Sequence, residues 1–213
     1  MTVTAVSYKD LAAPTAVRKP FTRAGWIFEL KYDGFRVLAG RHGDTVTLVS
    51  RRGTNLLPNY PEIGECLKAL PDLALDGELV MLDDVGRPQF EPLSRRLRLK
   101  KSDAIMSASR KHPAVVFAFD LLGLKGKDLR RLPLLTRKAM LKDVLKDSAR
   151  IRHVEHIGEE GERLFKMAER LGLEGIVAKR AASAYPKGRT SDWVKLKTTA
   201  GRRIDAQRRR WNE

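Results

Sequence analysis

The sequence has a single cysteine, Cys66, among 213 residues. One thiol cannot form a disulfide within the chain, and it excludes a cysteine-rich zinc site. No apolar run approaches the roughly 20 residues that a membrane-spanning helix needs, and residues 1–14 contain no apolar segment typical of a signal peptide. We therefore expect a protein without a membrane partner that works in the cytoplasm.

Acidic residues are scarce relative to basic ones. The chain has 26 Asp and Glu against 42 Lys and Arg, a formal net charge of +16. The excess is clustered, at residues 95–101, 110–111 and 202–210. Clustered cations favour polyanionic partners, because each phosphate contact releases condensed counterions. Composition thus indicates a nucleic acid or nucleotide partner, and the alternative is a surface that merely keeps the protein in solution.

Mixed strands and helices predict an α+β fold of antiparallel sheets flanked by helices. Residues 1–24 read as an irregular surface lead-in, residues 25–198 as one domain, and residues 199–213 as a basic tail. We expect the tail to be solvated and partly disordered, with a crude DNA contact as its alternative. The strands are expected at 26–31, 35–41, 45–50, 73–82, 114–122, 151–156, 174–179 and 193–197, and the helices at 59–70, 91–101, 136–147 and 159–171.

Three further expectations concern a loop, the face of one helix and the histidines. The dozen residues after Lys101 read as loop. In the helix that Thr136 would cap, the apolar face consists of Ala139, Met140, Val144 and Leu145. The four histidines show no metal-ligand spacing and read as surface or turn residues.

Lys31 ends the first predicted strand and is followed by Asp33, Gly34 and Arg36. A free lysine amine is protonated near pH 7, so a lysine nucleophile needs burial or neighbouring cations to lower its pKa. Lys195 and Lys197 share one face of the last predicted strand, because strand side chains alternate. That pair could hold a triphosphate and depress the pKa of Lys31.

Other residues suit the same chemistry. Glu78 and Glu174 could hold a divalent metal that shields phosphate charge. Phe117 or Phe119 could stack on a purine. Taken singly, each feature has a plainer explanation: the lysine motif and the acid at 78 suit turns, the aromatics suit a core, and the last lysines suit an edge strand.

Six motifs occur in a fixed order, and together they carry a resemblance. They are Glu29-x-Lys31-x-Asp33-Gly34-x-Arg36, Ser50-Arg51-Arg52-Gly53, Leu75-Asp76-Gly77-Glu78-Leu79, Phe117-Ala118-Phe119-Asp120-Leu121, Glu174-Gly175-Ile176-Val177-Ala178-Lys179 and Trp193-Val194-Lys195-Leu196-Lys197. This set resembles the covalent nucleotidyltransferases, an ATP-grasp-like fold class that includes ATP-dependent DNA ligases, RNA ligases and mRNA capping enzymes. The ligase domain of bacterial ligase D is the most similar variety, and the resemblance covers residues 25–198.

The resemblance implies a role for each matching residue. Lys31 would attack the α-phosphate of ATP and form lysyl-AMP. Glu29 would lie beside the adenine through its backbone carbonyl, and Phe119 would stack on the base, with Phe117 as the alternative. Lys195 and Lys197 would hold the α-phosphate and stabilise its developing charge.

The remaining roles concern the metal and the DNA. Glu78 would sit near the ribose or the metal, and Glu174 would act on the metal, Mg²⁺ or Mn²⁺. Arg36 and Arg51 would reach the ribose, the adenylate phosphate or the 5′-phosphate of a nick, and Arg52 is the alternative to Arg51. Lys179 and Arg189 would line the phosphate side of the site, with Arg189 also near the nucleic acid.

The implied activity is the sealing of nicked double-stranded DNA in repair, recombination or replication, in association with the nucleoid if the cell is bacterial. Alternatives are an RNA ligase, a capping-type transferase, or a non-catalytic DNA-binding relative. Ligases of this family follow the last lysine strand with an OB-fold domain, and too few residues follow Lys197 to build one. We therefore expect an adenylation domain alone, with a separate chain that supplies an OB fold or a DNA-end-binding function as a candidate partner.

Overall fold

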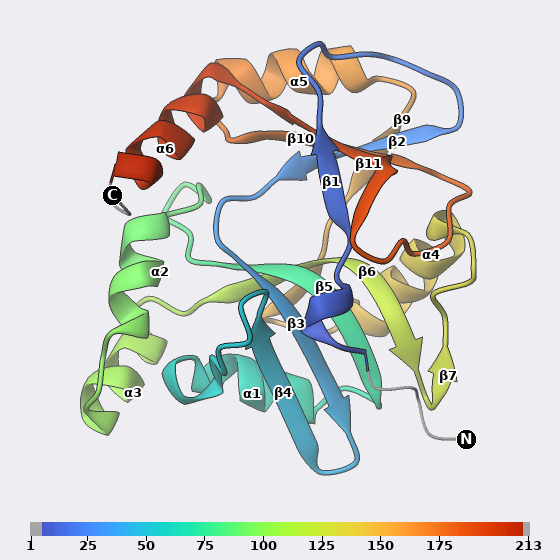
Figure 1. Cartoon of the computed structure of the whole chain (residues 1–213). Coiled ribbons are helices and arrows are strands. Elements are labelled where there is room, and N and C mark those ends of the chain that lie inside the picture. The colour runs from blue at the N-terminus through green and yellow to red at the C-terminus, as the bar shows by residue number, and fades with distance from the viewer. Residues whose placement is uncertain (1–5, 211–213) are drawn as a thin grey trace.

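The computed structural model describes the backbone of residues 6–210 and the side chains of residues 6–206. Two sheets face each other, and helices cover their outer sides (Figure 1). Sheet A has the strand order β1-β11-β10-β2-β9, and sheet B has the order β4-β3-β5-β6-β7, with β8 paired to β6. Nearly all neighbours are antiparallel; β1 with β11 and β6 with β8 are parallel. The predicted α+β class is confirmed.

Most of the predicted strands are present, but the one expected at 151–156 is two short strands, one in each sheet. Sheet A contains β1 (Ala13–Ala16), β2 (Trp26–Lys31), β9 (His156–Gly158), β10 (Gly175–Arg180) and β11 (Arg189–Lys197). Sheet B contains β3 (Phe35–His42), β4 (Thr45–Ser50), β5 (Leu73–Val80), β6 (Val115–Leu124), β7 (Lys127–Asp128) and β8 (Ile151–His153). The helices are α1 (Pro61–Lys68), α2 (Phe90–Leu97), α3 (Ser102–Lys111), α4 (Leu134–Leu145), α5 (Gly161–Arg170) and α6 (Thr199–Arg210), with short 3₁₀ turns η1 (Tyr8–Asp10) and η2 (Leu57–Asn59). None of the described helices is long and apolar enough to cross a membrane.

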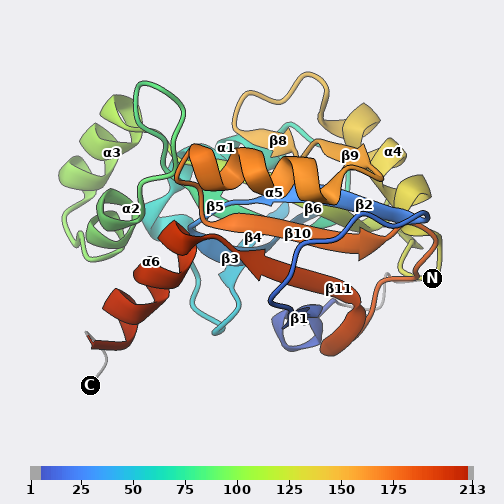
Figure 2. The same ribbon diagram turned by 90° about the horizontal axis from the view of Figure 1, so that it is seen from above.

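Each sheet packs its own helices against its outer face. Sheet B shares a core with α1 and α4 that includes Val37, Leu67 and Leu141. Sheet A packs Phe28 and Ile176 against the apolar side of α5, which lies across β2 and β10 in the view from above (Figure 2). Because the helices pack on the outer faces of both sheets, the inner faces of the sheets line a cleft.

Three parts of the chain differ from the expectations. The lead-in contributes η1 and the edge strand β1, where Pro14 is tolerated beside a register shift. The expected loop after Lys101 is the helix α3, which has only one buried residue and therefore no apolar stripe to reveal it. The tail forms α6 up to Arg210, so the expectation of disorder is wrong there, while residues 211–213 lie outside the described part.

The face of α4 also differs from the prediction. Pro133, not Thr136, precedes the helix, and Ala139 is exposed. Buried Arg137 and Lys138 share the inner face with Leu141 and Leu145. Charged side chains can occupy an apolar stripe when each has a buried partner, and these two do. His153 is likewise buried rather than superficial, with an exposed side-chain fraction of 8%.

The segment between β2 and β3 carries the chain from sheet A to sheet B, and Gly34 lies at the crossing. A Cβ on Gly34 would lie 2.1 Å from the carbonyl oxygen of Leu79 and 2.7 Å from Cγ1 of Val80. The glycine is therefore required by close packing of the crossing on β5.

We predict that Gly34→Ala lowers the free energy of unfolding by about 3 kcal/mol, because backbone and side chain must move to admit the methyl group. Urea unfolding followed by circular dichroism measures the change. Gly43→Ala is the matched control, since Gly43 has φ +55° with no atom within 4 Å of a Cβ and should cost only about 1 kcal/mol. Equal losses in the two variants would contradict the packing argument.

Candidate active site

A cleft of about 960 Å³ opens between the inner faces of the two sheets. Sheet A contributes Glu29, Lys31, Val177, Lys179, Trp193 and Lys195, sheet B contributes Arg36, Glu78 and Phe119, and the loop after β4 contributes Arg51 and Arg52. Helix α2 closes one side with Phe90, Ser94, Leu97 and Arg98, and α6 adds Asp205. The cleft thus gathers nine of the twelve predicted site residues, Lys31 included; Glu174, Arg189 and Lys197 do not line it.

A chain of alternating charges occupies one end of the cleft. Lys31 Nζ lies 2.7 Å from Glu174 Oε2, and Lys197 Nζ lies 2.8 Å from the other oxygen of Glu174. Lys197 Nζ also lies 2.6 Å from Asp205 Oδ1, on α6. Residues from β2, the start of β10, β11 and α6 therefore meet here, and two lysines share one carboxylate.

The electrostatics of this end suit a phosphate ligand. Burial and the charges of Lys31, Lys197 and Arg51 lower the pKa of Lys195, so this amine stands in a field of cations. Burial also lowers the pKa of Lys197, but its hydrogen bonds to Asp205 and Glu174 outweigh this and raise it. An anion entering here would meet several cations at once and offset their repulsion.

Glu78 lies at the same end, from β5. Burial raises its pKa to about 7, against the opposing influence of Lys31 and Arg36, while the charges of Glu174 and Asp33 raise it further. Carboxylates that disfavour one another's charge are the usual setting for a divalent cation, which binds through one or two carboxylates together with substrate phosphates. No group of three or more His, Cys, Asp or Glu residues that could hold a metal ion occurs within the described residues.

Arg36 lines the cleft, and its guanidinium group is fixed by hydrogen bonds to the buried Asp76. Its Nε and Nη2 donate to Asp76 Oδ1 at 3.0 Å and Oδ2 at 2.7 Å. Tyr185 donates its hydroxyl hydrogen to the same carboxylate at 2.6 Å and accepts from the backbone N–H of Ala12 at 3.0 Å. The buried Asp76 therefore ties β3 and β5 of sheet B to the loop before β11 and to the start of β1.

The other end of the cleft is aromatic. Lys179 Nζ lies 4.4 Å from the ring centre of Phe119 and 4.1 Å from that of Trp193. The guanidinium carbon of Arg36 lies 5.3 Å from the Phe119 ring centre. Phe117 is stacked on Tyr32, with the ring centres 4.0 Å apart, and does not line the cleft. Between the two candidates for a base-stacking aromatic, the geometry favours Phe119.

Glu29 is buried at this aromatic end with an ammonium group on each oxygen. Lys138 Nζ lies 2.6 Å from Oε1, and Lys179 Nζ lies 2.6 Å from Oε2. Burial raises the pKa of Glu29, but the two lysines lower it more, so the group is a carboxylate. Lys179, expected on the phosphate side, thus lies at the end of the cleft that holds Glu29 and Phe119.

Arg189 is the predicted residue that the structure leaves apart. It begins β11, opposite Ala13 of the edge strand, and it is exposed and absent from the cleft lining. Lys197 does not line the cleft itself but reaches it through Glu174 and Asp205.

Sequence reasoning missed several residues of this site, including Asp76, Lys138, Tyr185, Arg98 and Asp205. Lys138 gave a signal that could have been used, since Arg137 and Lys138 interrupt an apolar stripe that runs from Leu134 to Leu141. Cations at core positions of a helix indicate buried acidic partners. Asp76 lies in one of the motifs and Arg98 in a basic cluster, but neither pattern indicated a place in this site, and Tyr185 and Asp205 have no local signature.

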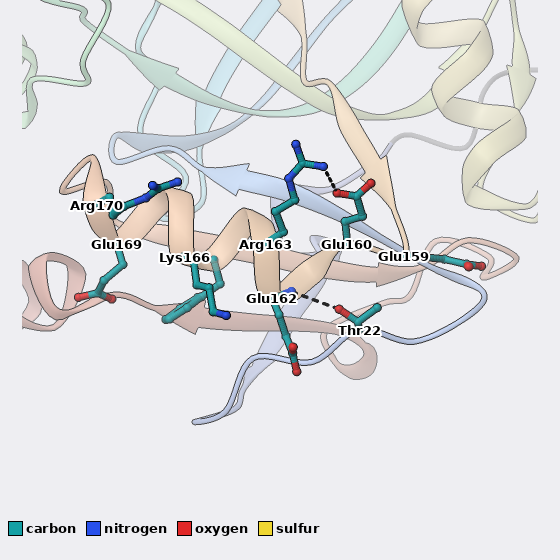
Figure 3. Close-up of a pocket in the computed structure, with 9 residues that line it drawn as sticks. Thr22, Glu159, Glu160, Glu162, Arg163, Lys166, Glu169 and Arg170 are labelled. Atoms are coloured by element: carbon teal, nitrogen blue, oxygen red, sulfur yellow. Dashed lines mark hydrogen bonds and ion pairs between the residues drawn. The ribbon is translucent and has the colours of Figure 1, made fainter.

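A second hollow, of about 830 Å³, lies on the outer side of α5 (Figure 3). Apart from Thr22, its labelled side chains are charged residues of both signs. Arg163 pairs with Glu160 at 2.6 Å, and the backbone N–H of Glu162 donates to Thr22 Oγ1 at 3.4 Å. Because α5 covers the outer face of sheet A, this hollow is separated from the lysine cleft by the sheet.

Two facing, largely antiparallel sheets and a lysine in the cleft between them define the covalent nucleotidyltransferase class. The chain belongs to the family described as "ATP dependent DNA ligase domain", whose model matches residues 5–197. It is therefore a ligase adenylation domain, similar to those of bacterial ligase D.

Named relatives agree with this family. The chain is 35% identical over 203 residues to the bifunctional non-homologous end joining protein LigD of Bacillus subtilis, covering 86% of the chain and 33% of that protein. It is 36% identical over 181 residues to a DNA ligase of Thermococcus fumicolans, covering 81% of the chain and 32% of that enzyme. The chain thus spans about a third of the length of these two relatives.

Solved structures give the same fold. The ligase domain of LigD from M. tuberculosis has a TM-score of 0.71 and 29% identity, covering 90% of this chain and 62% of that one. The DNA ligase of bacteriophage T7, solved in complex with ATP, has a TM-score of 0.66 at 21% identity, covering 89% of this chain and 68% of that one. The latter likeness supports the fold alone.

Proposed function

We propose that the chain charges itself with AMP from ATP and passes the AMP to the 5′-phosphate of a DNA nick. The observation that carries the proposal is the position of Lys31, whose amine lies at the cationic end of the cleft beside Glu174, with Lys195 and Lys197 on β11, two strands away in the same sheet. An α-phosphate placed there would face a nitrogen nucleophile and the groups that stabilise its developing charge.

The proposed reaction has three steps. The deprotonated Lys31 amine attacks the α-phosphorus, a nitrogen–phosphorus bond forms, and the bond to the bridging oxygen breaks to release pyrophosphate. An oxygen of the DNA 5′-phosphate then displaces Lys31 from phosphorus. The 3′-hydroxyl finally attacks the 5′-phosphorus of the nick, loses its proton and releases AMP. Glu174, 2.7 Å from the Lys31 amine, is placed to accept the amine proton before the first step.

The carboxylate groups near the phosphate end are suitable ligands for a divalent metal. Glu78 and Glu174 supply carboxylate oxygens at the phosphate end. Because the pKa of Glu78 is raised, a bound cation there would stabilise its ionised form. Mg²⁺ bound here would offset the negative charge of the triphosphate. Within the chain itself, the same charge is met by Lys195, Lys197 and Arg51.

The DNA partner is supported by the surface beside the cleft. Helices α2 and α3 project together from one end of the molecule (Figure 1). Five exposed cations, Arg98, Lys100, Lys101, Arg110 and Lys111, lie on or between them, and none has an ion-pair partner within 4.0 Å among the described side chains. Arg98 lines the same cleft as Arg51 and Arg52, so this basic surface connects the site with the exposed cations of α2 and α3, as binding of a duplex backbone requires. Nicks in a bacterial chromosome would place the protein at the nucleoid.

The test uses one protein sample in two stages. Incubation with ATP and Mg²⁺ should add the mass of one AMP, and peptide mapping should place it on Lys31. A chase with nicked duplex DNA should then remove the adduct and yield sealed strand, whereas nicked RNA should not. An uncharged protein would refute the adenylation step, and a charged protein that releases AMP only to RNA would move the substrate to the RNA ligases.

A further inference from the structure

Lys138 has no place in the steps described above. It projects from α4, which covers sheet B, and its side chain is buried with 1% exposed. Its amine lies 2.6 Å from Glu29 Oε1 and donates to the carbonyl oxygen of Val154 at 2.8 Å. Glu29 and Lys179 line the cleft, but Lys138 does not. It therefore stands one layer behind the surface that a nucleotide would touch.

The two lysines on Glu29 differ in what else constrains them. Lys179 rests against the rings of Phe119 and Trp193 in the cleft, where an entering base would disturb it. Lys138 is anchored in the scaffold by the backbone of the segment between β8 and β9. Of the two partners, only Lys138 can hold the Glu29 carboxylate in place while the cleft fills and empties.

The position of Glu29 suits its carboxylate to contact the base of a bound nucleotide. It lies two residues before Lys31 on the same face of β2, and its partner Lys179 lies 4.4 Å from the centre of the Phe119 ring, which lines the same cleft. An ionised carboxylate only accepts hydrogen bonds. It attracts the exocyclic amine of adenine, whereas it repels the carbonyl oxygen that guanine and hypoxanthine carry at the same position.

We propose that Lys138 is a positioning residue for base selection: it holds Glu29 at the base end of the cleft as a fixed carboxylate that favours a purine with an exocyclic amine. The proposal rests on the proposed adenylation function. It predicts an effect on nucleotide binding and discrimination, with little effect on the transfer step, because Lys138 lies behind the lining of the cleft and contacts Glu29 rather than Lys31.

The experiment compares ATP with ITP, which carries the carbonyl oxygen instead of the amine. The rate of AMP or IMP adduct formation is measured by intact mass across a range of nucleotide concentrations. Lys138→Met should raise the KM for ATP about tenfold, leave the rate at saturation within about threefold, and reduce the preference for ATP over ITP about tenfold. Quenching of tryptophan fluorescence by AMP reports binding without catalysis, because Trp193 lies beside Lys179.

Lys142→Met is the matched control. Lys142 lies one turn further along α4, is exposed, and pairs with Glu155 at 3.1 Å. It should behave as wild type in every measurement. A double-mutant cycle with Glu29→Gln tests whether Lys138 acts through Glu29, since Lys138→Met should have less than a twofold further effect on the KM when the carboxylate is absent.

The outcomes separate the two hypotheses. A wild-type protein that forms no adduct would refute the adenylation function, and AMP quenching would still report on Lys138. An unchanged KM and ATP preference in a folded Lys138→Met protein would overturn the positioning role, as would an equal effect of Lys138→Met with and without Glu29. If Lys138→Met fails to fold alone, the double variant without the buried carboxylate and Glu29→Gln alone are compared; a large KM difference between these two would overturn it as well.

Discussion

Lys31→Ala is expected to form no AMP adduct, a loss of at least about 10⁴-fold in the rate of charging. The alanine removes the only atom that bonds to phosphorus in the proposed first step. The cationic surroundings remain, because Lys195 is unchanged and Lys197 keeps Glu174 and Asp205 as partners. Intact mass after incubation with ATP and Mg²⁺ measures the loss.

The same variant should still act on a nick that already carries AMP on its 5′-phosphate. That substrate bypasses the two steps in which a bond to Lys31 forms and breaks. In the sealing step Lys31 contributes only its charge, so sealing should persist within about tenfold of wild type. Lys187→Ala is the control, since Lys187 is exposed and pairs only with Asp10, at 2.9 Å. An adduct on the Lys31→Ala protein would show that another residue is the nucleophile.

The largest loss of stability is expected from Arg137→Met. Arg137 and Asp120 are both fully buried, and they are joined by two hydrogen bonds of 2.7 and 2.8 Å. Arg137 also donates to the carbonyl oxygens of Leu132 and Ser183. Methionine would leave a buried carboxylate without its cation, which typically costs about 3–5 kcal/mol. For a chain of this size, the melting temperature should fall by about 10 °C.

Differential scanning calorimetry of the two proteins measures this change. The pKa of Asp120 is already raised by burial, although Arg137 lowers it, so the loss should be smaller at acidic pH, where the orphaned acid can be neutral. Arg163→Met is the control. It breaks an exposed pair with Glu160 that should contribute at most about 1 kcal/mol. A melting temperature within 2 °C of wild type for Arg137→Met would contradict the argument.

The local pattern was enough to predict the centre of the domain. The strand before Lys31, the crossing at Gly34 and the next two strands have strong alternation or turn signals, and β2, β3 and β4 confirm them within one residue. By contrast, α3 and α6 are polar helices with little burial, and β1 is four residues with a proline. Such elements are held by tertiary contacts that a local pattern does not contain.

The sequence was enough to predict many of the residues that form the site, but not which of their side chains pair with one another. The motifs predicted that Lys31 and Lys195 share one cleft, and the structure places Glu174 against Lys31. Nothing in their spacing indicated that Glu174 bridges two lysines, or that Lys138, more than 100 residues from Glu29, would hold that carboxylate. Partner choice among buried charges depends on side chains that meet only after the sheets have packed.

The chain of alternating charges from Lys31 through Glu174 and Lys197 to Asp205 means that the resting cleft supplies its own counter-ions. An incoming triphosphate must replace carboxylates on the lysines, and an incoming cation must replace ammonium groups on Glu174. Each exchange exposes a group that the other ligand then satisfies, so nucleotide and cation should bind cooperatively although they touch different residues. Asp205 makes α6 a participant in that exchange, because releasing Lys197 to phosphate frees the helix from β11 at this contact.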